Sequence, residues 1–172
     1  VYFTLYLPSG PRPPAGWPIV LTGGGTSTNQ HITATNFASK MASHGIATIG
    51  INHVGQGFGP LGTLRVNMRN GTSLTIPDAG RGIDQNRDTV ITNGEGSEAA
   101  SPRTWTISSR DAHRQTVIDL MQLVRVIEVG MDVDGDSAAD VDPSRIYFVG
   151  ASAGSMIGTV FMALDPNVPA GV

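Results

Sequence analysis

The chain has 172 residues, of which 40% are hydrophobic and 15% are charged, with a formal net charge of −3 and no cysteine. This composition is typical of one globular domain with a sizeable core, and it provides no basic surface for nucleic acid. Disulfides and thiolate metal sites are excluded, and no apolar stretch approaches the roughly 20 residues of a transmembrane helix.

The first third of the chain alternates between strand and helix patterns. Residues 1–7 and the apolar run 19–22 are expected to be strands, separated by a proline-rich connection. The second of these strands runs directly into three consecutive glycines at 23–25. Small and apolar residues at helical spacing predict a helix that ends near Ala42, and residues 46–51 predict the next strand.

Residues 55–107 form a long glycine-rich insert with little periodicity. A connection of this length inside one domain is typical of a functional loop or of a segment organised by a bound ion. A helix is expected to begin at Ser108, because Ser108 and Asp111 have the spacing of a helix start, and to end at Gly130. A short apolar strand follows at 146–149.

This strand leads into Gly-Ala-Ser-Ala-Gly at 150–154, which has the spacing G-x-S-x-G, and a helix is expected from Ala153. In such an arrangement the serine lies on a sharp bend between strand and helix with its hydroxyl exposed. The flanking glycines leave room for the bend, and the first amides of the helix point to where an oxyanion could form. We therefore interpret Ser152 as a nucleophile; the alternative is an ordinary helix-start serine.

The alternation of strands and helices predicts the fold class. We expect a single α/β domain over residues 1–172, with a mostly parallel sheet and helices on both of its faces.

The order of these elements, from the triple glycine to Gly-Ala-Ser-Ala-Gly, resembles the N-terminal half of α/β-hydrolases, especially large secreted bacterial lipases and esterases. The resemblance implies that Ser152 attacks carboxylic esters, including lipids, and that the protein is secreted or periplasmic. It also implies an oxyanion hole made of backbone amides from the loop after the second strand and from the residue after the nucleophile. Carried over to this sequence, these are Gly24, Gly25, Thr26 and Ala153.

In that family the acid and the histidine follow the nucleophile in the chain. After Ser152 this sequence has no histidine and only one acid, Asp165. The histidines all precede the serine: His31, His44, His53 and His113. Of these, His53 is expected at the end of a strand and is the candidate to face the substrate. We therefore expect an incomplete catalytic unit, to which a C-terminal companion segment or second chain adds the acid, the base and cover for the sheet edge.

Two acidic stretches have a spacing similar to that of the twelve-residue calcium loop, which supplies oxygen ligands at alternate positions. The candidate ligands in the insert are Asp84, Asn86, Asp88, Val90 and Glu95. The candidates before the last strand are Asp132, Asp134, Asp136 and Asp140. A structural calcium ion would hold the insert beside the serine. The alternative is that both stretches are polar surface turns.

The sequence leaves two functions open. The first is a serine hydrolase of carboxylic esters with Ser152 as nucleophile. The second is a non-catalytic, calcium-stabilised module with a hydrolase-like sheet, or a pseudoenzyme. A phosphate-binding role for residues 23–25 is not favoured, because no Lys-Ser or Lys-Thr follows the glycines as in a P-loop.

Overall fold

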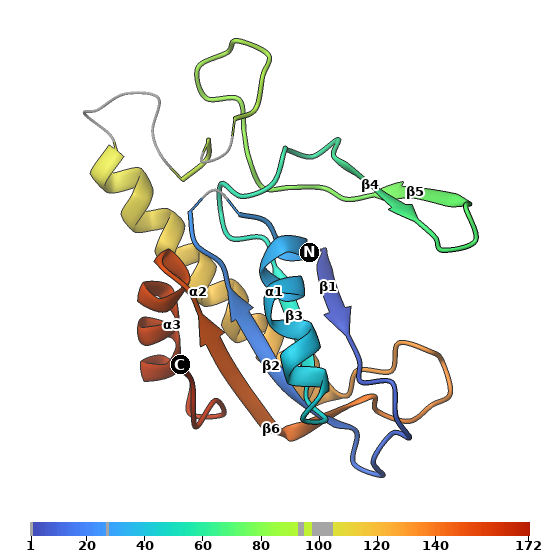
Figure 1. Ribbon diagram of the computed structural model, residues 1–172. Coiled ribbons are helices and arrows are strands. Elements are labelled where there is room, and N and C mark those ends of the chain that lie inside the picture. Colours follow the sequence, from blue (N-terminus) through green and yellow to red (C-terminus); the bar gives the residue numbers. More distant parts are fainter. Residues whose placement is uncertain (1, 27, 93–94, 98–104) are drawn as a thin grey trace.

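A computed structural model describes residues 2–26, 28–92, 95–97 and 105–172 (Figure 1). In chain order the elements are β1 (Phe3–Tyr6), β2 (Trp17–Gly23), α1 (Gln30–Ala42), β3 (Ala47–Ile51), β4 (Thr63–Asn67), β5 (Ser73–Pro77), α2 (Trp105–Val129), β6 (Val141–Gly150) and α3 (Ala153–Leu164).

The main sheet has the strand order β1-β3-β2-β6. Strand β2 is parallel to both of its neighbours, β3 and β6, but β1 runs antiparallel to β3. The α/β class is confirmed. The sheet is mixed: two of its three pairings are parallel, in agreement with a mostly parallel sheet, and the pairing of β1 with β3 is antiparallel. Side-chain alternation predicts that a segment is a strand, but it carries no information on the direction of the neighbouring strand.

Helix α1 covers one face of this sheet, and α2 and α3 cover the other (Figure 1). The buried core lies between the sheet and the α2–α3 layer, where aliphatic residues of β2, β3 and β6 pack against both helices. Phe148 of β6 and Phe161 of α3 meet edge to face, with ring centroids 5.6 Å apart. This packing fixes α3 against the strand that precedes it.

The register between β2 and β6 places the ends of the two strands side by side. Gly23, the last residue of β2, is paired with Gly150, the last residue of β6. The glycine-rich turns that follow β2 and β6 therefore begin side by side, at the carboxyl ends of these two parallel strands. On its other side β6 is bordered by the end of the described chain, because Phe148 forms a parallel bridge with Gly171. The sheet is thus extended beyond β6 by a short stretch of backbone around Gly171.

The insert contains a β-hairpin that the sequence reading missed. Strands β4 and β5 pair antiparallel and project away from the main sheet (Figure 1). Asn70-Gly71 in the turn, flanked by alternating apolar residues, is a recognised hairpin signal that could have predicted it. Helix α2 begins at Trp105, three residues before the expected start at Ser108. The Ser108–Asp111 pair was therefore misread as a helix start. None of the described helices is long and apolar enough to span a membrane.

Candidate active site

Ser152 occupies a strained bend between β6 and α3. Its backbone has φ 54° and ψ −122°, outside the regions that non-glycine residues ordinarily adopt. The residue precedes the first helical turn, yet its side chain makes no capping hydrogen bond, and it is exposed. An ordinary serine at a helix start stabilises the helix, because its hydroxyl oxygen accepts a hydrogen bond from a backbone N–H of the first turn. Ser152 does not, so the ordinary reading of this serine explains the geometry less well.

Glycines let three backbone segments meet at this bend. The N–H of Ala151 donates to the carbonyl of Gly23 at 3.0 Å, which ties the bend to the end of β2. A Cβ on Gly154 would overlap that same Gly23 carbonyl, and a Cβ on Gly150 would lie 2.8 Å from the backbone of Gly154. The glycine spacing of the motif is therefore required by backbone contact.

The loop after β2 lies against the serine. A Cβ built on Gly25 would lie 3.3 Å from Cβ and 3.7 Å from Oγ of Ser152. Gly24 is buried instead, and a Cβ there would overlap the hydroxyls of Thr28 and Thr33. Of the expected oxyanion residues in this loop, Gly25 is thus beside the serine, whereas Gly24 is buried against Thr28 and Thr33.

Two further expected oxyanion residues flank this contact. Thr26 is exposed, and Ala153 is the first residue of α3. The N–H of Ala153 has no backbone partner in the described part of the chain. A free amide at the start of a helix can donate a hydrogen bond to an anionic oxygen.

A residue that the sequence reading missed holds the Gly25 loop in place. Nε2 of Gln56 donates to the carbonyl of Gly25 at 2.9 Å and to Oγ1 of Thr28 at 3.3 Å. Gln56 itself is 7% exposed. A glutamine in a glycine-rich loop carries no sequence signal for this role, because the contact joins segments about thirty residues apart.

His53 does not face solvent in the described chain. It is 4% exposed, and its Nε2 is buried without a hydrogen-bond partner. The pKa of His53 is lowered to about 4, mainly by burial and also by the nearby positive charge of Arg81 and by the neighbouring His113. Asp119, which forms an ion pair with Arg81 at 2.6 Å, opposes this effect. A substrate-facing role for His53 would therefore require this cluster to open.

No histidine of the described residues is hydrogen bonded to Ser152. His31 lies between Thr4 and Asp78, with bonds of 2.7 and 2.8 Å from its two ring nitrogens. His44 lies beyond the end of α1, and His113 is on α2. The structure therefore brings the serine and the Gly25 loop together, while none of the described histidines is hydrogen bonded to the serine as a general base.

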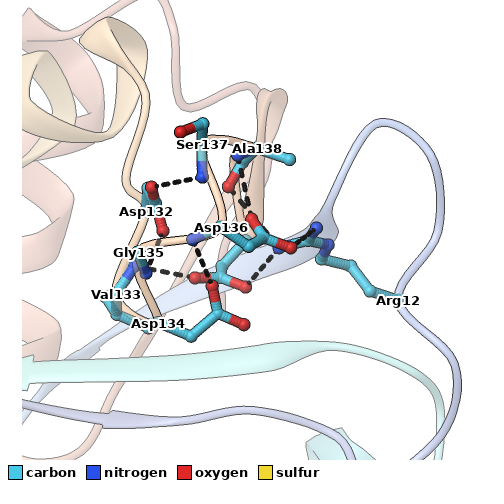
Figure 2. Close-up of polar contacts among 9 residues, drawn as sticks. Arg12, Asp132, Val133, Asp134, Gly135, Asp136, Ser137 and Ala138 are labelled. Atoms are coloured by element: carbon cyan, nitrogen blue, oxygen red, sulfur yellow. Dashed lines mark hydrogen bonds and ion pairs between the residues drawn. The ribbon is translucent and has the colours of Figure 1, made fainter.

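The second acidic stretch brings three carboxylates together (Figure 2). Carboxylate oxygens of Asp132, Asp134 and Asp136 lie within 4.8 Å of one another, a grouping able to hold a metal ion. Asp140 is separate from them: it is 3% exposed and binds the N–H of Val133 at 2.8 Å.

Arg12 reaches this loop from the connection before β2 (Figure 2). Its guanidinium is 2.5 Å from Asp136 and 2.9 Å from Asp140. The hydrogen bond from Arg12 keeps the pKa of Asp136 below its usual value. An arginine thus already compensates part of the negative charge that a calcium ion would otherwise neutralise.

The acidic stretch in the insert has the same turn geometry but no comparable carboxylate group among the described residues. Asp84 accepts from the N–H groups of Arg87 and Thr89, as Asp132 accepts from those of the third and fifth residues after it. Asn86 and Asp88 likewise cap the loop backbone, and Val90 donates to Asp88. The carboxylate of Glu95 is hydrogen bonded to Thr92 and to the N–H of Gln85.

Comparisons with known proteins address the fold. No family model and no curated protein matches the sequence. The acetyl xylan esterase from Paenibacillus sp. R4 matches with a TM-score of 0.53 and 21% identity, over 98% of this chain and 42% of that chain. The ferulic acid esterase from Streptomyces cinnamoneus matches with a TM-score of 0.50 and 19% identity, over 91% of this chain and 35% of that chain. The chain thus spans less than half the length of these two structures, and it has an esterase-like fold.

Proposed function

We propose that this chain carries the nucleophile of a serine hydrolase that cleaves carboxylic esters. The observation that carries the proposal is the backbone of Ser152, which holds an exposed hydroxyl in a strained conformation without any capping bond. Strain that brings no local stabilisation is typical of functional sites. The likeness to two esterase structures adds support at the level of the fold.

In the proposed reaction, Oγ of Ser152 attacks the ester carbonyl while a base takes its proton. The carbonyl oxygen becomes an oxyanion, which the amides of Ala153 and of the Gly25 loop would stabilise, each by about 3 kcal/mol. The intermediate collapses, the C–O bond to the alcohol breaks, and the alcohol leaves with the proton from the base. Water then releases the acid from the acyl-enzyme by the same steps.

The acid and the base of this reaction are proposed to come from a companion segment outside residues 1–172. None of the described histidines reaches Ser152, and the two esterase structures are more than twice as long as the part that this chain matches. The companion would continue the sheet beside residues 170–172, whose backbone is hydrogen bonded to β6. A secreted or periplasmic location and activity on lipids stay predictions.

A fluorophosphonate probe tests this proposal on the full-length protein. We expect labelling of Ser152 and, in the Ser152→Ala variant, loss of both labelling and ester hydrolysis by at least about a thousandfold. The matched control is Ser155→Ala, one turn later on the same exposed face, which should keep both. Equal labelling of wild type and Ser152→Ala would refute the proposal.

Two observations favour the second candidate, a non-catalytic calcium-stabilised module or pseudoenzyme. Ser152 has no histidine partner in the described chain, and three carboxylates are grouped at residues 132–136. This candidate predicts that the full-length protein hydrolyses no ester and that a chelator lowers its melting temperature.

A further inference from the structure

The side chain of Gln56 joins the loop beside Ser152 to the loop that follows β3. Its Nε2 donates to the carbonyl of Gly25 at 2.9 Å, and its Oε1 accepts from the N–H of His53 at 3.1 Å. These two partners also assign the orientation of the amide, because only its nitrogen can donate and only its oxygen can accept. The buried amide therefore holds two backbone segments together, with both of its ends bonded.

The loop that carries Gln56 is itself anchored to the core. The backbone carbonyl of Gln56 accepts from the N–H of Arg81 at 2.6 Å. The N–H of Val54 donates to Oγ1 of Thr116 at 3.2 Å, and Thr116 is a buried residue of α2. Helix α2 packs in the hydrophobic core. Gln56 thus connects the Gly25 loop to a rigid part of the fold.

The bond from Gln56 fixes the direction of the peptide between Gly25 and Thr26. This peptide is trans and planar, so its C=O and its N–H point in opposite directions. The carbonyl is directed at Gln56 and also accepts from Oγ1 of Thr28 at 2.8 Å. The N–H of Thr26 therefore points away from Gln56, and it has no hydrogen-bond partner among the residues that the structure describes. The loop thus offers a free donor on the side away from Gln56.

The glycine at position 25 makes such a constraint necessary. A peptide plane can turn over when the residue before it changes ψ and the residue after it changes φ, and glycine allows both orientations at little steric cost. Turned over, the plane would place the carbonyl oxygen of Gly25 where the N–H of Thr26 now lies, and this oxygen would repel an anion. The turn would also break the bond from Gln56, whose buried Nε2 would keep only Oγ1 of Thr28 at 3.3 Å.

This peptide lies beside the candidate nucleophile. A Cβ on Gly25 would lie 3.7 Å from Oγ of Ser152. Each of these two neighbouring residues is followed by a residue whose N–H has no backbone partner in the described chain, Thr26 in one turn and Ala153 in the other. Two free amides therefore lie within one residue of the contact between the two turns.

We propose that Gln56 is a positioning residue for the oxyanion hole: by holding the carbonyl of Gly25, it keeps the N–H of Thr26 aimed at the oxygen that becomes negative. The inference rests on the proposed function for the reaction, and it adds the residue that organises the donor. Gln56 acts through Gly25 and touches no substrate atom. Because the N–H is oriented before the charge develops, the transition state gains the hydrogen bond without reorganisation of the loop.

The isosteric change Gln56→Glu tests this proposal in the full-length protein. It keeps an acceptor for the N–H of His53 but places a carboxylate oxygen against the carbonyl of Gly25. We expect kcat and kcat/KM for p-nitrophenyl acetate to fall together by about a hundredfold, as when an oxyanion donor is removed, while KM changes by less than about threefold. The control Gln122→Glu, at an exposed position of α2, should change neither.

A second variant serves if circular dichroism shows that Gln56→Glu does not fold. Thr28→Val keeps the shape of the side chain and removes the other donor to the carbonyl of Gly25. It should lower kcat by about fivefold, the size of one neutral hydrogen bond, again with little change in KM.

An NMR measurement gives a readout that a general loss of stability would not reproduce. In protein with isotope-labelled threonine, the amide proton of Thr26 should move downfield when a fluorophosphonate modifies Ser152, because the phosphoryl oxygen of the adduct stands in for the oxyanion. The same modification of Gln56→Glu should leave this signal unshifted. The signal of Thr26 is assigned by its loss in Thr26→Ser.

Three results would overturn the inference: an unchanged kcat in the folded Gln56→Glu variant, a raised KM with kcat unchanged, or an unshifted Thr26 amide in the modified wild type. In each of these cases the wild type still cleaves esters and is labelled at Ser152, so the esterase proposal stands. If the wild type is neither labelled nor active on any ester, the esterase proposal fails and the role of Gln56 fails with it.

Discussion

The bend at residues 150–154 and the insert at 55–107 are both rich in glycine but use it differently. In the insert, Gly55, Gly57 and Gly59 have positive φ angles of 83°, 76° and 91°, so glycine itself takes the unusual conformation. At the bend the glycines have ordinary φ angles, and the residue with positive φ is Ser152. At the bend the strain thus lies on a residue that carries a side chain, whereas in this part of the insert glycine takes it up. Side-chain-bearing residues also have positive φ angles in the two acidic loops: Arg87, Thr89 and Ser137, at 65°, 70° and 70°.

The largest expected effect comes from adding a methyl group at the bend. In Gly154→Ala the added Cβ would overlap the Gly23 carbonyl, and the start of α3 would have to move away from the end of β2. We expect this change to lower the free energy of unfolding by about 3 kcal/mol or more. Urea unfolding measures this. Gly10→Ala is the control, because its Cβ would meet only Trp17 at 3.7 Å.

The corresponding change in the insert is Gly80→Ala. It should loosen the insert and speed amide hydrogen exchange there, with a smaller loss of global stability. Equal decreases in the free energy of unfolding for Gly80→Ala and Gly154→Ala would mean that the insert and the bend unfold as one unit. That result would contradict the expected difference in stability between the two regions.

His53, at the contact between the insert and α2, should make stability depend on pH. Its pKa is about 4 in the fold and about 6.5 when unfolded, so the unfolded chain binds more protons between these values. The stabilisation is complete above pH 6.5 and is lost as the pH falls toward 4, by about 3 kcal/mol in all. Denaturant unfolding across this range should show the loss in wild type and in the exposed-site control His44→Gln. In His53→Gln the loss should be absent, and an unchanged pH profile would contradict the assignment.

A chelator should distinguish the two acidic loops. If calcium binds at residues 132–136, removing it lowers the free energy of unfolding by about 2.7 kcal/mol when the ion is present at a hundred times its Kd. Asp134→Asn should abolish this sensitivity, because Asp134 belongs to the carboxylate group. Asp88→Asn, in the insert loop, should leave it intact. If Asp88→Asn abolishes the chelator sensitivity and Asp134→Asn leaves it intact, the calcium ion binds to the insert loop instead.

The smallest expected effect concerns the strain at the nucleophile. Ser152→Gly removes the side chain that disfavours φ 54° and should raise the free energy of unfolding by about 1 kcal/mol while abolishing fluorophosphonate labelling. Ser155→Gly, inside α3, should instead lower it by about 1 kcal/mol. A stability loss with Ser152→Gly would show that the bend is not strained.

The elements around the bend could be predicted because their signals are local. The apolar run before Gly150 and the spacing of Gly150, Ser152 and Gly154 lie within one strand and one helical turn. The insert was harder because its order comes from distant contacts, such as Gly80 against Gly57 and Arg81 against Asp119. Such contacts leave no periodic pattern in the sequence.

By itself, the sequence determined the sharp junction at Ser152, since short-range backbone sterics dictate where glycine is required. Only the tertiary structure decided that Gly25 lies against this serine, that His53 is buried and that β1 runs antiparallel. These outcomes depend on sheet register and on packing between segments far apart in the chain, and pairing Gly23 with Gly150 is what joins the two turns.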